Sequence, residues 1–178
     1  LSERVEGNLL AAAQEIEKLV LLAGDQPLTV DRVLAAVGDS ARYSIYDFVD
    51  AALRGQPERV ARILNGLRGE GVEPVLANWA LHRELRVLNA LAFARDQRQP
   101  PETVFAAFAA RKEIVWDKRK PSLLQALQRL TLADCRSLLN ACARTDRAIK
   151  GIEPGSPWDA LLMAGLRLAG RRLLPDEL

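Results

Sequence analysis

The chain has 178 residues, of which 49% are hydrophobic and 27% are charged, and its formal net charge is +2. This composition is typical of a globular protein and excludes a disordered chain, while the small charge excludes a protein that coats nucleic acid over its whole surface, so any DNA contact is expected to be local. No apolar run approaches the roughly 20 residues that a membrane-spanning helix needs, and we expect no membrane partner.

The segment from Glu6 to Leu19 predicts an α-helix that is already under way where the chain starts. Its apolar residues recur at steps of three or four, which places them on one face of a helix. They are Val5, Leu9, Ala13, Ile16 and Val20. Gly24 and Pro27 predict the end of this helix. A chain that starts here is expected to be part of a longer protein.

The next segments predict a domain boundary. A short helix is predicted from Thr29 to Val37, and the turn-forming cluster Gly38-Asp39-Ser40 follows it. Another helix is predicted from Ser44 to Arg54, because Ser44 and Asp47 have the spacing of a capping box. We therefore expect the boundary between residues 38 and 39.

Start and stop signals predict six further helices. They run from Pro57 to Glu70, Pro74 to about Gln97, Pro101 to Ala110, about Ser122 to Leu130, Thr131 to Lys150, and Ser156 to about Arg172. The helix from Pro74 is the longest, about 36 Å, and could serve as a spine for its neighbours. Since no strand pattern occurs, the predicted fold class is all-α, a helical bundle.

The two cysteines, Cys135 and Cys142, lie seven residues apart on one predicted helix. Their separation along the axis, about 10.5 Å, excludes a disulfide between them. We expect both to be small buried hydrophobic residues, which favours a reducing compartment, the cytoplasm.

The sequence has few groups that could form a catalytic or metal site. There is no glycine-rich phosphate loop with a following lysine. His82 is the only histidine, and neither metal ligands nor a nucleophile motif accompany it. We therefore predict no catalytic residues, no metal and no cofactor.

The segment from Arg111 to Lys120 has no clear helix signal but carries a local charge of +3, from five basic and two acidic residues. Trp116 lies within it. Cations around an aromatic ring are typical of single-stranded DNA binding, because the cations follow the phosphates while the ring stacks on an unpaired base. The candidate DNA contacts are Trp116, Lys118, Arg119 and Lys120. The alternative is that Trp116 packs in the core with Ile114 and Val115.

A second candidate surface lies on the long helix. Trp79, His82 and Arg86 follow one another at steps of three and four and therefore share a face, which Asn89 extends. Tryptophan and arginine are enriched at protein interfaces, so this face is a candidate subunit contact. The alternative is a partly buried Trp79 with His82 and Arg86 at the rim of the core.

Taken together, several segments resemble the delta subunit family of the bacterial DNA polymerase III clamp loader. They are Glu6 to Leu19, Ser44 to Asp50, Val72-Glu73-Pro74 with Arg83-Glu84-Leu85, Val115-Trp116 with Arg119, and Trp158. Within the charged segment, Arg119 matches the family pattern, whereas Lys118 and Lys120 are candidates on charge alone.

The resemblance implies that residues 1–38 are the C-terminal part of an AAA+-like lid domain and residues 39–178 a helical collar domain. A preceding ATPase-like domain, which would hold the sliding-clamp contact, is missing. The implied partners are gamma/tau-type and delta-prime-type subunits, the sliding clamp and primer-template DNA. The hinge near Gly38 to Ser40 would transmit ATP-driven changes from the partner subunits.

The resemblance also implies a subunit without ATPase activity. Related active ATPases carry Gly-Ser-Leu-Arg where this chain has Gly7-Asn8-Leu9-Leu10, and a leucine cannot contact a γ-phosphate as an arginine does. We therefore predict a non-catalytic clamp-loader subunit. The alternatives are a helical single-stranded DNA-binding module centred on Trp116, and a chain whose complete form is a working ATPase.

Overall fold

A computed structural model describes residues 13, 17, 20, 43–113 and 115–171. The chain divides into two compact units, Leu1–Arg42 and Tyr43–Leu178. In the first unit the described residues Ala13, Glu17 and Val20 are helical, as the opening helix requires. The rest of that helix, Leu10 included, lies outside the described residues, as do the helix predicted from Thr29 to Val37 and the turn at Gly38 to Ser40.

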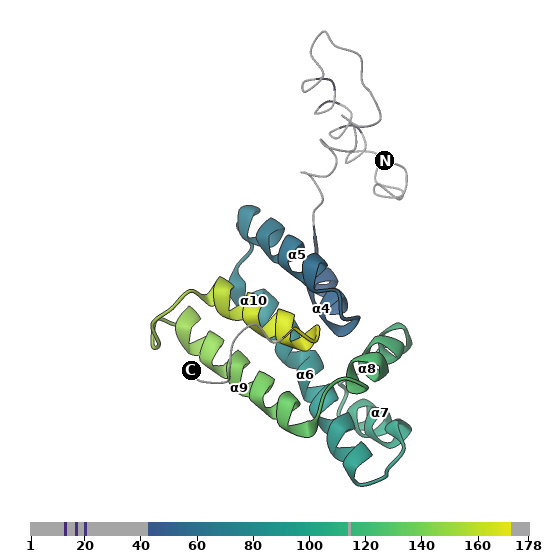
Figure 1. Cartoon of the computed structure of the whole chain (residues 1–178). Helices are drawn as coiled ribbons and strands as arrows, with labels where there is room; N and C mark the ends of the chain where they lie inside the picture. The colour runs from purple at the N-terminus through teal and green to yellow at the C-terminus, as the bar shows by residue number, and fades with distance from the viewer. Residues whose placement is uncertain (1–12, 14–16, 18–19, 21–42, 114, 172–178) are drawn as a thin grey trace. The chain divides into compact units, whose positions relative to one another are not determined.

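The second unit is a bundle of α-helices (Figure 1). Its helices are α4 (Ile45–Leu53), α5 (Pro57–Gly69), α6 (Pro74–Asp96), α7 (Pro101–Ala110), α8 (Lys120–Leu127), α9 (Leu132–Ile149) and α10 (Pro157–Leu168), with a 3₁₀ turn, η1 (Asp117–Arg119), before α8. No strand occurs in residues 43–113 and 115–171. The predicted all-α fold class is confirmed.

Two of the predicted helix starts are capping boxes. Asp47 N donates to Ser44 Oγ at 3.2 Å, and Ser44 N donates back to the Asp47 carboxylate at 2.8 Å. Thr131 and Asp134 make the same reciprocal pair at 3.1 and 2.9 Å at the start of α9. Because each box satisfies backbone donors that the first helical turn leaves unpaired, it defines where the helix begins.

Three predicted helix bounds, in two helices, are wrong. Helix α8 begins at Lys120 and ends at Leu127 rather than spanning Ser122 to Leu130. Ser122 lies inside the helix, where its buried hydroxyl donates to Asp50 at 3.3 Å instead of capping. Helix α10 ends at Leu168 rather than near Arg172, since Gly170 adopts a φ of +94°, which stops a right-handed helix.

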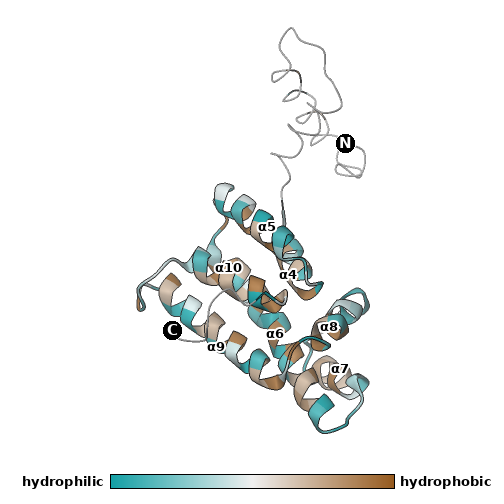
Figure 2. Ribbon diagram, in the orientation of Figure 1, coloured by the Kyte–Doolittle hydropathy of each residue, from teal (hydrophilic) through white to brown (hydrophobic). Residues whose placement is uncertain are grey.

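Helix α6 is the spine of this unit and packs against α4, α7, α8, α9 and α10. Its residues Leu81, Leu85, Leu88 and Leu91 are fully buried. The surrounding helices are amphipathic, and Figure 2 shows hydrophobic and hydrophilic residues alternating along them. The apolar residues that recur along these helices thus pack into one continuous core around α6.

Helix α10 approaches α4 and α5 closely because position 165 has no side chain. A Cβ added at Gly165 would lie 2.7 Å from the Phe48 ring and 2.9 Å from a methyl carbon of Val60. Both neighbours are fully buried. The absence of a methyl group at this position therefore sets the distance between three helices.

Cys135 and Cys142 lie on α9 and are both buried and free, as predicted. Burial raises the pKa of the Cys135 thiol to about 11 and that of Cys142 to about 12. Since the thiolate is the reactive form, both thiols are inert at neutral pH. The Asn78 side chain donates to the Cys142 carbonyl at 3.1 Å and joins α6 to α9.

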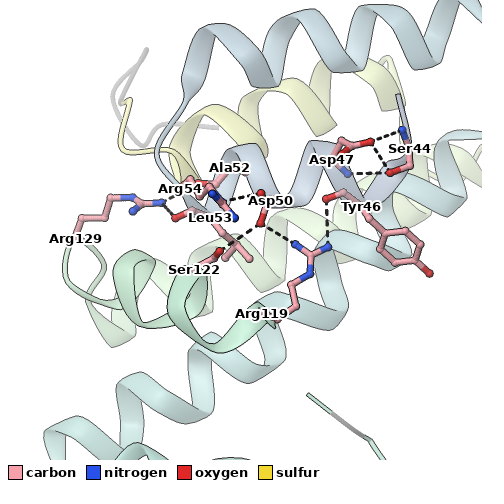
Figure 3. Close-up of polar contacts among 10 residues, drawn as sticks. All are labelled: Ser44, Tyr46, Asp47, Asp50, Ala52, Leu53, Arg54, Arg119, Ser122 and Arg129. Atoms are coloured by element: carbon pink, nitrogen blue, oxygen red, sulfur yellow. Dashed lines mark hydrogen bonds and ion pairs between the residues drawn. The ribbon is translucent and has the colours of Figure 1, made fainter. Parts of the chain in front are cut away.

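Arg129 joins the C-terminal ends of α4 and α10. Its guanidinium donates to the carbonyl oxygens of Ala52 and Leu53 at the end of α4, as Figure 3 shows, and to that of Leu168 at the end of α10. The last carbonyls of a helix have no partner within the helix and carry partial negative charge. One cation thus satisfies two helix ends that are far apart in the sequence.

Candidate functional site

Trp116 is exposed, so the interpretation that it packs in the core is wrong. It lies in the connection between α7 and α8, where its extended backbone caps η1, and 58% of its surface is accessible. Val115 beside it is half-buried and packs against the core, and Ile114 lies outside the described residues. The buried neighbour thus anchors the segment while the indole faces solvent.

Two lysines lie near aromatic rings in this segment. The ammonium nitrogen of Lys118 is 5.0 Å from the centre of the Trp116 ring. That of Lys120 is 5.2 Å from the centre of the Phe105 ring and 2.6 Å from the Asp117 carboxylate, whose pKa it lowers through a hydrogen bond. Lys118 therefore combines with Trp116, whereas Lys120 is held by a neighbouring acid.

Arg119 is directed into the fold. Its side chain is only 14% exposed, and it donates to Asp50 at 3.2 Å and to the carbonyl oxygen of Tyr46 at 3.3 Å (Figure 3). Asp50 also pairs with Arg54 at 2.8 Å. These contacts join η1 to α4, so Arg119 positions the segment that carries Trp116 and has little surface left for a phosphate.

A pocket of about 330 Å³ opens beside Trp116. Helices α4 and α6 and the connection between α7 and α8 form its walls. Two exposed aromatic residues, Trp116 and Tyr46, line it together with the apolar side chains of Val87 and Phe108. An aromatic wall in a partly enclosed pocket can hold a flat ligand by stacking.

The pocket also contains a buried acid, Glu84 on α6, which is 8% exposed. Burial raises the pKa of the Glu84 carboxyl, and the nearby guanidinium groups of Arg119 and Arg83 oppose that rise. Glu84 was not a predicted site residue. Its position between Leu81, Leu85 and Leu88 on the buried face of a predicted helix was the signal that could have found it.

The predicted subunit-contact residues on α6 are all exposed at the surface. Trp79 is 51% exposed, His82 is exposed, and the Arg83 guanidinium lies 5.9 Å from the centre of the Trp79 ring. Arg86 is also exposed, but it pairs with Glu113 at 3.0 Å.

Two apolar residues that were not predicted, Val75 and Leu76, extend this surface and are more than two-fifths exposed. We call Val75, Leu76, Trp79 and His82 the α6 face. These residues lie close together in sequence in the N-terminal part of α6 and expose three apolar side chains and a histidine.

In the part of the chain that the structure describes, no group of three or more histidine, cysteine or acidic residues is arranged to hold a metal ion. The same residues include no helix with the length and apolar character required to cross a bilayer.

Comparison with known proteins gives consistent matches. Residues 45–176 match the family described as the processivity clamp loader gamma complex DNA pol III C-term. The chain is 38% identical to DNA polymerase III subunit delta of Escherichia coli over 168 residues, which are 94% of this chain and 47% of that protein. It is 33% identical to the subunit of the same name from Haemophilus influenzae over 150 residues, 82% of this chain and 43% of that protein. The chain thus spans less than half the length of these relatives.

Proposed function

The chain belongs to the family of DNA polymerase III delta subunits, and from this premise we propose that it is a non-catalytic part of the clamp loader that holds the subunit in the assembly. Residues 39–178 form the helical collar in this proposal, and residues 1–38 belong to an AAA+-like lid. The sliding clamp is contacted by a domain that lies outside this chain. Its place of action is the cytoplasm, where the DNA is.

The observation that carries the proposal is the α6 face. Trp79 is half exposed beside Val75 and Leu76, which are also exposed, and neighbouring apolar side chains at the surface are typical of a site that a partner protein covers. Tryptophan is also the residue most enriched among those that dominate binding energy. We propose that gamma/tau-type and delta-prime-type subunits are the partners and that one of them covers Trp79.

Proteins that belong to one complex elute together, so this assembly is tested by size-exclusion chromatography of the chain mixed with the gamma-type and delta-prime-type subunits. The wild-type chain is expected to elute with them. Trp79→Ala is expected to weaken this association at least ten-fold, the loss typical of an interface hot spot of about 2 kcal/mol.

Phe93→Ala is the matched control, since Phe93 is also a half-exposed aromatic residue on α6 but lies about 21 Å further along the helix. Phe93→Ala is expected to associate like the wild type. Elution of the wild-type chain apart from both subunits would contradict the collar assignment.

A second function is supported by the exposure of Trp116. We propose that Trp116 stacks on an unpaired base of primer-template DNA while Lys118 contacts the adjacent phosphate. Lys120 contributes long-range attraction, and Arg119 holds the segment in place through Asp50. The DNA contact at Trp116 is compatible with the role as a collar, because a clamp loader must bind DNA as well as its own subunits.

Quenching of tryptophan fluorescence tests the DNA contact. Single-stranded oligothymidine is expected to quench the wild-type chain, less so as salt rises. The Trp116→Ala variant should lose that quenching, whereas Trp79→Ala should keep it. A wild-type chain whose emission is unchanged by DNA at low salt would contradict the proposal.

A further inference from the structure

Glu84 is the feature of the pocket beside Trp116 that neither assembly nor stacking explains. The residue is more than nine-tenths buried and lines the pocket. No hydrogen bond or ion pair joins it to another residue in the described part of the chain. The Glu84 oxygens are not among the fully enclosed side-chain atoms that lack a partner, so they are open to the pocket, where the donors of a ligand can reach them.

The other acids of the pocket already have partners. Asp47 accepts from Ser44 in the capping box, Asp50 pairs with Arg119, and Glu113 pairs with Arg86. Glu84 is therefore the acceptor that remains for a ligand among the described residues of the pocket wall.

The charge of the pocket argues against a cationic ligand. Its described lining has four carboxylates and four basic residues: Arg54, Arg83, Lys118 and Arg119. A lysine or arginine side chain entering from a partner would approach Glu84 but would also meet these cations, and such like-charge contacts are costly. The ligand that fits is neutral, is flat enough to lie on the exposed indole of Trp116, and donates hydrogen bonds. A nucleobase has these properties.

Guanine matches the acceptor best. An ionised carboxylate only accepts hydrogen bonds and offers two oxygens side by side. Guanine presents two adjacent donors, N1–H and N2–H₂, on its pairing edge. Adenine and cytosine each present one donor beside a ring nitrogen that a carboxylate repels, and thymine presents one donor between two carbonyl oxygens.

We propose that the pocket takes an unpaired guanine of the DNA strand, which stacks on Trp116 and donates two hydrogen bonds to Glu84. This inference rests on the proposed contact between Trp116 and DNA and adds a base preference to it. The charges of Arg119 and Arg83 oppose the rise that burial causes in the pKa of the Glu84 carboxyl, and in this proposal Lys118 contacts the phosphate of the same nucleotide. Enzymes that extrude a base from its stack read it in the same manner, through its pairing edge and an aromatic surface.

The test uses oligothymidines of roughly ten nucleotides, within the usual site size, each with one central guanine, adenine or hypoxanthine base. Binding is measured by tryptophan quenching of the whole chain. The wild type is expected to bind the guanine oligonucleotide about five-fold or more tightly than the adenine one, the discrimination of one bidentate pair. Hypoxanthine, which keeps N1–H but lacks the amino group, should fall between them.

Glu84→Gln should reduce the guanine-to-adenine ratio to about one, because an amide no longer offers two acceptors. Glu73→Gln, at an exposed position before the same helix, is the control that should keep the ratio. Thermal unfolding of both variants checks that each is folded. A ratio near one in the wild type, or a ratio that Glu84→Gln leaves unchanged, would overturn the guanine pocket while the Trp116 contact stands.

If no oligonucleotide quenches the wild type, the Trp116 contact itself fails, and the guanine pocket fails with it. If Glu84→Gln keeps the base ratio and instead loses association with the partner subunits, Glu84 receives a protein side chain, which also overturns the proposal. These outcomes distinguish the base preference from the function on which it rests.

Discussion

The ammonium group of Lys118 lies 5.0 Å from the centre of the Trp116 ring, whereas the neighbouring Arg119 is directed into the fold. A cation at this distance is attracted to the face of the indole. In the proposed DNA contact, a base that stacks on Trp116 would lie close to the charge of Lys118. The proposal thus depends on these two residues rather than on the net charge of the whole segment.

Lys118→Gln is expected to weaken single-stranded DNA binding a few-fold and to lower the salt dependence of log K by about 0.7, the value for one phosphate contact on a single strand. Quenching at saturation should remain, since Trp116 is intact. Arg136→Gln, an exposed cation on α9, is the control and should leave the slope unchanged. An equal slope in the wild type and Lys118→Gln would exclude the phosphate contact.

Arg119→Met is expected to destabilise the fold by about 2 kcal/mol, because Asp50 loses one of its two charged donors and the Tyr46 carbonyl loses its guanidinium donor. Urea unfolding measures this loss. The salt dependence of DNA binding should stay near that of the wild type in the folded fraction. A stable Arg119→Met chain with a reduced salt slope would instead make Arg119 a DNA contact.

Arg129→Met is expected to cost about 2–4 kcal/mol of unfolding free energy, since carbonyl oxygens at the ends of α4 and α10 lose their donor. Burial lowers the pKa of the Arg129 guanidinium, because it removes water from the cation. Urea denaturation should show the loss, and Arg136→Met on the exposed face of α9 should change stability by less than about 0.5 kcal/mol. Similar urea midpoints for Arg129→Met and Arg136→Met would show that the hydrogen bonds of Arg129 to the ends of α4 and α10 do not stabilise the fold.

Two glycine substitutions are expected to act in opposite directions. Gly165→Ala should destabilise by about 1–3 kcal/mol, because its methyl group would overlap Phe48 and Val60. Gly69→Ala, at the end of α5, meets no atom within 4 Å and should stabilise by up to about 1 kcal/mol through helix propensity. Thermal unfolding of both variants makes the comparison, and a loss of stability in Gly69→Ala would contradict the packing described here.

The stability of Glu84→Gln should depend on pH. Burial raises the folded-state pKa of Glu84, so the fold favours the protonated form, and the stability from this carboxyl is lost as pH rises through the folded pKa. Glu84→Gln should therefore be at least as stable as the wild type at pH 7, and its advantage should disappear in acid, below the unfolded pKa. Unfolding midpoints of both proteins are measured from acid to pH 7. If the wild type becomes more stable relative to Glu84→Gln as the pH rises, the argument from burial is contradicted.

Helix starts were predictable from the sequence where the cap is local. Ser44 with Asp47 and Thr131 with Asp134 are three residues apart, so the residues that define the start are visible together. Ser122 has the same chemistry, but its hydroxyl is taken by Asp50 from another helix, and the predicted start was wrong. The core stripe of α6 was equally predictable, because spacing decides which residues share a face.

The candidate site depended on contacts that spacing does not reveal. Arg119 and Asp50 are 69 residues apart, so the sequence could suggest a basic residue for DNA but could not show that its charge is engaged. The exposure of Trp116 likewise depends on Val115 being the residue that turns inward. Glu84 becomes a pocket residue only when α4 and the connection between α7 and α8 close around it.

Radical footprinting of the two tryptophans tests the central claim most directly, because Trp79 and Trp116 are both about half exposed in the free chain. The account predicts that assembly with the gamma-type and delta-prime-type subunits, without DNA, slows oxidation of Trp79 and leaves that of Trp116 unchanged. Adding primed DNA should then slow oxidation of Trp116. If Trp79 is oxidised as fast in the assembled complex as in the free chain, the α6 face is not the surface that holds this subunit.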